Sequence, residues 1–292
     1  MDVSIILVNY NTKELLRNCL NSIFEKTRDI EFEVFVVDNA SSDASCEVVE
    51  KEFQQVKLIK NTENLGFGKA NNIAIRQSSA KYVFLLNSDT ILINNAVKTF
   101  FDFMEKDENK RVAACAGDLF DERMNKQTSF GNFPSLTEIF FRLGLKYLFR
   151  EYYENNLTLI RKNNSDLPHE IDYASGADLF LRKSVIDKVG AFDENFFMYY
   201  EDSDLCFRIK KAGYSIKILP DAKIIHLESK SSVIHLKREL ISKKSEIYFF
   251  RKYKSNFEVF VIKALYSIIY FIAIFVRKDS KYLTLLTETV LM

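Results

Sequence analysis

The stretch that decides the fold reads Lys81-Tyr82-Val83-Phe84-Leu85-Leu86-Asn87-Ser88-Asp89-Thr90. A short apolar run with a charge on one side and Asn-Ser-Asp on the other is typical of a buried strand. Ligands of open α/β sheets bind beyond the carboxyl ends of the strands, so Asp89 is placed to hold the metal ion that a phosphate-bearing ligand needs. The same three polar residues also favour ordinary turns, and this stretch alone leaves both interpretations open.

Similar strands and helices alternate on both sides of this stretch. Apolar runs predict strands over residues 3–8, 33–39, 56–59 and 112–116. Helical periodicity predicts helices up to residue 26 after a Thr12 N-cap, after Ser41-Ser42-Asp43, over 69–78 and over 95–106. Strands that alternate with helices form βαβ units, so the first 120 residues or so predict an α/β fold with a mostly parallel, nucleotide-binding sheet.

The pattern is weaker between residues 120 and 167. An amphipathic helix is predicted there from Leu136, Ile139, Phe140, Leu143 and Tyr147. It either faces the core or forms a lip that contacts an acceptor or a membrane. Regular structure resumes at residue 171, with a helix over 203–212, its C′ residue at Gly213, and two strands over 215–219 and 223–226.

Composition narrows the class of protein. The 292 residues suffice for one large or two small domains, and the formal net charge of +1 gives no reason to expect a nucleic-acid partner. Four widely spaced cysteines form no CxxC pair, which favours free thiols in a reducing compartment. The first apolar run is short and follows Asp2, so we expect no secretory signal and a cytoplasmic catalytic part.

Polar residues that could carry chemistry follow the predicted strands. Tyr10, Asp38 and Asp89 end strands, and His226 ends a later one, so Asp89 and His226 could form an oxygen-plus-imidazole site for a divalent cation. An acidic cluster of Glu201, Asp202 and Asp204 opens a predicted helix. Acidic residues in a first turn also stabilise the helix dipole, so the cluster alone leaves a purely structural role open.

Asp202 stands out within this cluster because it follows the aromatic run Phe196-Phe197-Met198-Tyr199-Tyr200. Aromatic neighbours desolvate a carboxylate and raise its pKa toward the range of a general base. Other enzyme classes are excluded by their missing motifs: the segment at Gly66 lacks P-loop spacing, no GxGxxG opens the first helix, and no GxSxG is present.

The ordered set of these segments resembles family 2 glycosyltransferases, most of all the rhamnosyltransferase-like branch that builds bacterial surface polysaccharides. The likeness covers residues 3 to about 232. It rests on VSIILVNYN (3–11), VVDNASSD (36–43), NLGFG (64–68), LLNSDT (85–90) and FFMYYEDSDLCFR (196–208).

This resemblance implies a GT-A fold over residues 1–230, a nucleotide-diphosphate sugar donor, a divalent metal (Mg²⁺ or Mn²⁺) and inversion at the anomeric carbon. It implies that Asp202 is the catalytic base and that Asp89 and His226 bind the metal. Asn87 stands where many members have the first Asp of a D-x-D motif, which removes one negative charge from the metal site. The implied donor-site residues are Val8, Tyr10 and Asp38 around the base, and Asn64, Gly66, Asn71, Asn87 and Ser88 nearer the phosphates or sugar.

The donor suggested by this branch is dTDP-rhamnose or a similar nucleotide sugar, and the acceptor a growing, lipid-linked saccharide. Asn87 keeps a second hypothesis open, that of a catalytically idle member that binds nucleotide sugars or scaffolds an assembly complex. A nucleotidyltransferase is a third hypothesis. It is disfavoured because Asn9-Tyr10-Asn11-Thr12 stands where a Gly-rich, basic phosphate loop would follow the first strand.

The C-terminal segment 231–292 differs in character from the rest. Residues 230–254 hold eight Lys/Arg and two Glu, a balance of 8 − 2 = +6, and an apolar stretch over 257–276 follows. Its uncharged part, 264–276, is shorter than the roughly 20 residues that a spanning helix needs. We therefore expect helices lying on the inner face of the plasma membrane. A packed helical hairpin and a contact within a homo-oligomer are the alternatives.

Overall fold

The computed structural model describes residues 1–144, 147–152, 165–227 and 235–292. Its centre is one mixed sheet in the order β3-β2-β1-β4-β11-β6-β12-β5, with β7 beside β6 and β9 beside β12. A two-stranded sheet pairs β8 with β10. The strands are β1 (Val3–Asn9), β2 (Phe32–Asp38), β3 (Lys57–Lys60), β4 (Tyr82–Asn87), β5 (Thr90–Leu92), β6 (Val112–Phe120), β7 (Lys126–Gln127), β8 (Phe130–Gly131), β9 (His169–Glu170), β10 (Tyr173–Ala174), β11 (Asp178–Arg182) and β12 (Ser215–His226).

The predicted α/β class is confirmed. Strands β3, β2, β1 and β4 run parallel to one another, as βαβ units require. Beyond β4 the sheet is mixed, because β11 runs antiparallel to both β4 and β6 while β12 is parallel to β6. The parallel half carries most of the strand ends that the sequence singled out.

Helices cover both faces of the sheet. They are α1 (Lys13–Lys26), α2 (Ser45–Glu52), α3 (Phe67–Gln77), α4 (Ala96–Glu105), α8 (Lys183–Val189) and α9 (Glu201–Lys211). Side chains of a strand alternate between faces. In β1, Val3, Ile5 and Leu7 therefore pack with α1, α2 and α4, whereas Ile6 packs with α3, α8 and α9 on the other face. The strands are buried from both sides, which explains their nearly continuous apolar runs.

Two sequence expectations are corrected here. The two strands predicted over 215–219 and 223–226 are one strand, β12, whose register to β6 shifts between Leu219 and Lys223. Pro220 lies in this irregularity, where its missing N–H costs no ladder hydrogen bond. The helix predicted from Leu136 to Tyr147 is the short α5 (Leu136–Arg142), and Gly144 follows it with φ +100°.

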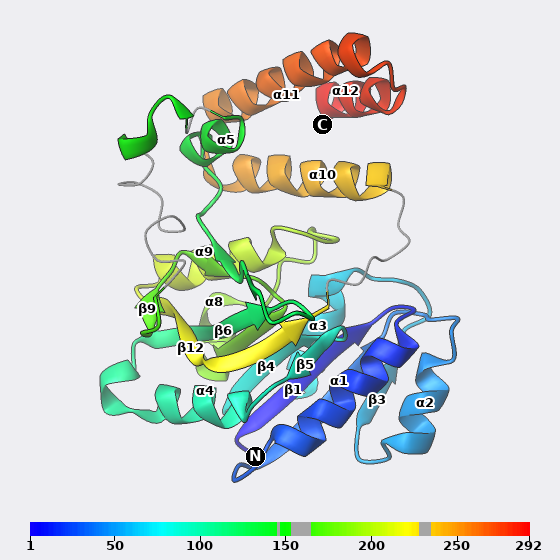
Figure 1. Cartoon of the computed structure of the whole chain (residues 1–292), viewed down its shortest axis with the longest axis vertical. Helices are drawn as coiled ribbons and strands as arrows, with labels where there is room; N and C mark the ends of the chain where they lie inside the picture. Colours follow the sequence, from blue (N-terminus) through cyan, green and yellow to red (C-terminus); the bar gives the residue numbers. More distant parts are fainter. Residues whose placement is uncertain (145–146, 153–164, 228–234) are drawn as a thin grey trace.

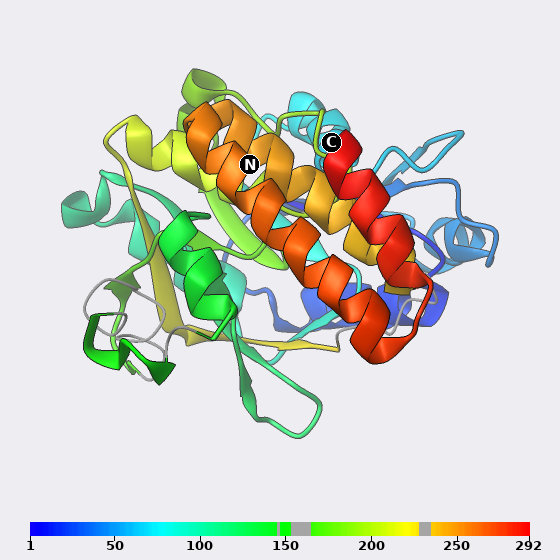
Figure 2. The same ribbon diagram turned by 90° about the horizontal axis from the view of Figure 1, so that it is seen from above.

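Three helices form a separate layer above α9 (Figures 1 and 2). They are α10 (His235–Tyr253), α11 (Asn256–Arg277) and α12 (Lys281–Leu291). Their shared core contains Phe249, Phe250 and Ile262, and it also takes in Ile139 of α5 and Phe196 of the loop before α9. The layer is thus packed onto α5 and onto the loop before α9. The expected boundary at 230/231 lies outside the described residues.

Part of the basic character of this segment is used inside the protein. Lys243 pairs with Glu246, Lys244 with Glu288, and Lys252 with Asp193 and Asp204. These pairs agree with the packed alternative for α10, and the membrane contact of this segment stays a prediction. The length estimate is corrected: α11 has 22 residues and a mean hydropathy of 2.4 over its most apolar window, enough by length and composition to cross a membrane.

Candidate active site

The carboxyl ends of β1, β2 and β4 meet at one edge of the sheet. Asn9 pairs with Asp38 across β1 and β2, and Val8 pairs with Asn87 across β1 and β4. Asn9 donates from Nδ2 to Asp38 Oδ1 over 2.8 Å. Three segments separated by dozens of residues in the chain thus place their polar ends side by side, where an α/β sheet binds its ligand.

The predicted metal ligands lie together at this edge. Strand β12 pairs His226 with Thr90 of β5, and His226 Nε2 lies 3.3 Å from Asp89 Oδ1 and 3.5 Å from Asn87 Nδ2. The backbone N–H of Leu227 donates to the Asp89 carbonyl over 2.9 Å and fixes the two segments. Asp89 and His226 are mostly buried, with side-chain exposures of 12% and 16%.

These residues suit a metal that is shared with the substrate. Among the residues that the structure describes, no three His, Cys, Asp or Glu side chains are grouped to hold a metal ion. Mg²⁺ in enzymes that act on phosphates is usually held by one or two carboxylates, with substrate phosphates and water completing its shell. One carboxylate and one imidazole, close together and able to accept a cation, fit such a half-site.

A network of amides forms the donor side of the edge. Asn39 follows Asp38 and donates to Asn64 Oδ1 over 3.3 Å and to the Gly66 carbonyl over 3.2 Å. Gly66 has φ +82°, and a Cβ there would lie 2.1 Å from the Phe197 carbonyl oxygen. Only glycine allows this turn to approach the loop before α9. The turn joins the predicted donor residues to the loop that leads to Asp202.

The other predicted donor residues differ in accessibility. Tyr10 is 46% exposed at the end of β1, and Val8 is half-buried below it. Ser88 lies beside Thr12, with 2.9 Å between their hydroxyl oxygens. Asp38 is buried and its two oxygens accept from Asn9 and from the Ser41 backbone.

Asn71 does not face this edge freely. Its side chain is buried, and Nδ2 donates to the Phe67 carbonyl over 3.0 Å. The amide therefore braces the first turn of α3, the helix that follows the Gly66 turn. Among the residues predicted to touch the donor, Asn71 thus uses its side-chain N–H for a hydrogen bond within its own helix.

Asp202 lies in the first turn of α9 and is partly buried. Its Oδ2 accepts from the Gly176 N–H over 3.1 Å, and its Oδ1 accepts from the Ser203 N–H over 2.6 Å. Burial raises the pKa of the Asp202 carboxyl, and these hydrogen bonds offset the rise only in part. A carboxylate whose pKa is raised by burial is a stronger base than an exposed one, as the aromatic run predicted.

The turn at 175–177 connects Asp202 to the metal half-site. Gly176 donates to Asp202, while the carbonyl of the next residue, Ala177, accepts from the Asn87 N–H over 2.9 Å. Gly176 itself leaves no room for a side chain, because a Cβ would lie 2.9 Å from the Phe67 ring. Asp202 and the Asn87–Asp89 segment thus flank the same short turn.

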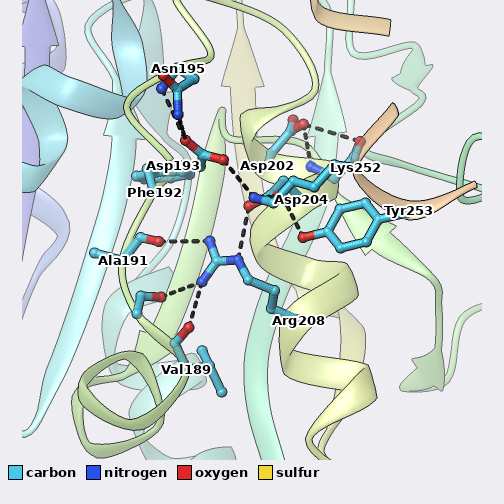
Figure 3. Close-up of polar contacts among 12 residues, drawn as sticks. Val189, Ala191, Phe192, Asp193, Asn195, Asp202, Asp204, Arg208, Lys252 and Tyr253 are labelled. Atoms are coloured by element: carbon cyan, nitrogen blue, oxygen red, sulfur yellow. Dashed lines mark hydrogen bonds and ion pairs between the residues drawn. The ribbon is translucent and has the colours of Figure 1, made fainter. Parts of the chain in front are cut away.

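The three acids at the start of α9 have different environments. Asp204 is fully buried and accepts from Arg208, Lys252 and Tyr253 over 2.6–2.9 Å, as Figure 3 shows. The structural alternative is correct for this residue. Glu201 is also buried, and among the described residues its Oε2 has no hydrogen-bond partner. Burial and then the neighbouring Asp202 charge raise the pKa of Glu201 well above its ordinary value.

Sequence reasoning missed several residues that shape this edge. Asn9 and Asn39 are fully or almost fully buried and hold Asp38, Asn64 and Gly66 in place. Gly176 supplies the hydrogen bond to Asp202. Asn9 and Asn39 belong to the strand-end motifs already quoted, so an amide directly after a buried strand was the available signal. Gly176 gave no such signal, because its role depends on contacts distant in the chain.

Comparison with known proteins gives the family. The model of glycosyl transferase family 2 matches residues 4–190. The rhamnosyltransferase WbbL of Escherichia coli K12 is 26% identical over 235 residues, covering 77% of this chain and 83% of the relative. An N-acetylglucosaminyl-diphospho-decaprenol L-rhamnosyltransferase of Mycobacterium tuberculosis is 26% identical over 243 residues, covering 78% and 76%. The dTDP-rhamnosyl transferase RfbF of Shigella flexneri is 25% identical over 232 residues, covering 78% and 70%.

Solved structures confirm the fold. A mannosyltransferase of Pyrobaculum calidifontis in complex with GDP-Man and Mn²⁺ superposes with a TM-score of 0.58 at 19% identity, covering 86% of this chain and 63% of that one. TarS of S. aureus gives a TM-score of 0.55 at 18% identity, covering 86% and 44%. This chain therefore spans about half to two thirds of those proteins. Together with the family match over most of the sheet, the fold and its strand-end motifs show that the chain belongs to glycosyl transferase family 2.

Proposed function

We propose that this protein is an inverting glycosyltransferase that moves a sugar from a nucleotide-diphosphate donor to a saccharide acceptor. One observation carries the proposal: the turn at 175–177 brings Asp202 and the Asn87–Asp89 segment to one edge of the sheet. Inverting transfer needs a base for the acceptor hydroxyl and charge neutralisation at the leaving diphosphate, and this edge offers a candidate for each.

In this mechanism Asp202 accepts the proton of an acceptor hydroxyl as its oxygen attacks the anomeric carbon. The new carbon–oxygen bond forms on the face of the sugar opposite the leaving diphosphate, and the bond to the diphosphate breaks with its electron pair going to the phosphate oxygen. Hydrogen bonds from Gly176 and Ser203 orient the Asp202 carboxylate. Positioned base catalysis of this kind supplies about 10²–10⁴-fold.

Asp89 and His226 would hold a divalent ion, Mg²⁺ or Mn²⁺, which neutralises charge on the leaving diphosphate. Asp89→Ala should weaken metal-dependent donor binding by at least about tenfold, because it removes the only carboxylate of the half-site. Asn87→Asp is the opposite change. It adds a negative charge beside His226 and should tighten metal-dependent donor binding. Calorimetry with Mn²⁺ and nucleotide sugar tests both. Unchanged affinity in Asp89→Ala would remove Asp89 from the site.

We propose dTDP-rhamnose or a similar nucleotide sugar as donor, because three relatives are named as rhamnosyltransferases. A lipid-linked saccharide is the proposed acceptor, since the Mycobacterium tuberculosis relative is named for a decaprenol-linked one. The four cysteines are free, which agrees with a reducing, cytoplasmic site of reaction.

The test of this function is a panel of nucleotide sugars with measurement of nucleotide release and of sugar bound to the acceptor. A transferase releases nucleotide from one donor and does so faster when a saccharide acceptor is added. Donor binding without release would instead support an idle, sugar-binding member of the family. Release of pyrophosphate from a sugar phosphate and a nucleoside triphosphate would identify a nucleotidyltransferase.

We further propose that residues 231–292 contact the inner face of the plasma membrane through α11 and α12. Only 17% of the most apolar window of α11 is buried inside the protein. Aromatic and aliphatic side chains more than half exposed lie along the two helices: Phe257, Phe260, Ile268, Phe271, Ile272, Phe275, Val276, Leu283, Val290 and Leu291. An exposed apolar face of this size favours a lipid surface, and it would bring the enzyme to a lipid-linked acceptor. A second copy of the chain is the competing occupant.

A further inference from the structure

The loop that leads to Asp202 has an unusual backbone. Tyr199 and Tyr200 both lie in the left-handed region, with φ +68° and +69°. Large side chains rarely adopt this conformation, and it persists only where the surrounding structure imposes it. Tyr200 is also the N-cap residue of α9, so its backbone sets the direction of the first turn, which contains Asp202. Contacts with the rest of the protein must therefore keep this loop in its conformation.

Helix α10 supplies the contacts that hold it. Ser245 donates from Oγ to the Met198 carbonyl over 2.8 Å, and the Tyr200 hydroxyl donates to Glu246 Oε1 over 2.7 Å. The Phe196 ring packs edge-on against Tyr248 with 4.8 Å between centroids. Residues of one helix thus contact the beginning, middle and end of the loop.

Glu246 is the centre of this arrangement. Its side chain is fully buried, and its second oxygen accepts from the Tyr266 hydroxyl over 2.9 Å and from Lys243 over 2.8 Å. A buried carboxylate with several donors makes strong, charge-assisted hydrogen bonds, and moving it away from those donors costs free energy. Lys243 and Tyr266 anchor it to α10 and α11, and Tyr200 joins it to the loop.

The opposite side of the loop is held by the donor-binding half of the protein. The Phe197 carbonyl accepts from the Phe67 N–H over 3.0 Å, directly after the Gly66 turn. The loop is therefore fixed between the start of α3 and the C-terminal helices. Loss of either support frees Tyr199 and Tyr200 to leave their strained conformation.

We propose that Glu246 is a positioning residue: through the Tyr200 hydroxyl it holds the 196–200 loop in the conformation that places Asp202. Helix α10 then supports the base from outside the sheet. This inference rests on the proposed function for its consequence in catalysis. The tether itself is a property of the fold and can be measured without the reaction.

Two matched variants test the proposal. Tyr200→Phe and Tyr266→Phe each remove one hydroxyl donor from the Glu246 carboxylate, but only Tyr200 belongs to the loop. We expect Tyr200→Phe to lower kcat for sugar transfer by about 10- to 100-fold, with donor KM changed by less than about threefold. Tyr266→Phe should keep kcat within about threefold of wild type, because Lys243 still donates to the Glu246 oxygen that Tyr266 contacts and the bond from Tyr200 is untouched. Ser245→Ala is an independent second test and should lower kcat in the same direction.

Hydrogen exchange followed by mass spectrometry gives the readout that needs no activity. Peptides covering 196–204 should exchange faster in Tyr200→Phe than in Tyr266→Phe, at equal thermal stability of the two variants. Equal exchange in both, or a loss of activity carried by donor KM, would overturn the proposal. A wild-type protein that transfers no sugar would refute the proposed function, and the exchange comparison would still decide on the tether.

Discussion

Asp202 and Asp204 occupy the same first turn of α9, but their side chains meet different chemistry. Asp204 is enclosed by a guanidinium, an ammonium and a phenol, all of which stabilise its negative charge. Within the part of the chain that the structure describes, Asp202 accepts from backbone N–H groups and a hydroxyl, and burial raises its pKa. A carboxylate already paired with two cations is a poor base, whereas Asp202 can still take a proton.

Gly66 offers a sharp test of the donor side. Gly66→Ala should destabilise the protein by more than about 1–2 kcal/mol, because the left-handed backbone strains alanine and its Cβ meets the Phe197 carbonyl. Gly213→Ala is the control: its φ of +84° carries the same strain, but the nearest atom to a Cβ is an Arg111 nitrogen at 3.6 Å. Urea unfolding compares them. Equal losses of stability would contradict the close approach.

The residues around the site were only partly predictable. Asp38, Asp89 and His226 were found because a carboxylate or imidazole directly after a buried strand is a visible signal. Asp202 was singled out by its aromatic neighbours and by the family resemblance. The pairing of Asp204 was not visible, because it depends on Lys252 and Tyr253 of α10, nearly fifty residues later. Asn71 was expected near the donor, and only its bond to Phe67 shows that it braces α3.

At the scale of elements, ion pairs and a hydrogen bond join α10 to α9 and to the loop before it. Lys252 donates to both Asp193 and Asp204 over 2.6 Å, and Tyr248 also donates to Asp193 over 3.0 Å (Figure 3 shows Lys252 and Asp193). Burial works against the charge on Asp193, yet hydrogen bonds from Lys252 and Asn195 prevail and lower the pKa of Asp193 to about 2. This contact therefore stabilises the fold only while Asp193 is ionised.

The pH dependence follows from the sign of that shift. A carboxyl whose pKa is lowered by folding contributes stability above its ordinary pKa of about 4, and this contribution is lost as the pH falls toward 2. Asp193→Asn should cost about 1–2 kcal/mol at pH 7, after allowance for solvent screening, and almost nothing near pH 2. Urea unfolding between pH 7 and pH 2.5 measures it, with the exposed Asp221→Asn as control. A cost independent of pH would exclude the ion pair as its source.

The regular elements of the first half were predictable because they are buried on both sides. Apolar runs located β1, β2 and β4 to within one or two residues. The predictions for 136–147 and for β12 were less accurate for physical reasons. Apolar spacing alone did not show that α5 ends at Arg142, before Gly144, and the bulge at Pro220 looks like a strand break although β12 pairs with β6 on both sides of it.

At the scale of the whole molecule, the two sides of the C-terminal layer have different surroundings. Its inner side holds the 196–200 loop. On its outer side lie α11 and α12 (Figure 2), whose apolar side chains are exposed. Three of the lysines that suggested an electrostatic contact with lipid, Lys243, Lys244 and Lys252, are paired within the protein. Any membrane contact should therefore be driven by apolar burial and change little with salt.

Vesicle flotation tests this contact. Phe271 and Phe275 are 55% and 65% exposed on α11, and replacing both with Ser should weaken binding by at least about tenfold, because each ring contributes about 1.5–3 kcal/mol when buried in lipid. Met124→Ser, an exposed apolar residue on a distant turn, should float like wild type. Flotation that is equal in all three proteins, or a stable dimer that the double variant abolishes, would assign the face to a second copy instead.

The central claim is that Asp202 acts as the base, and a comparison of Asp202→Asn with Glu201→Gln tests it most directly. Glu201 is the adjacent buried acid, and Gln keeps the size of its side chain while removing the carboxylate. With nucleotide sugar and acceptor, Asp202→Asn should lower kcat by about 10²–10⁴-fold, about 3–5 kcal/mol in barrier, at unchanged donor affinity. Glu201→Gln should stay within about tenfold of wild type. Sugar transfer by Asp202→Asn at the wild-type rate would contradict the mechanism.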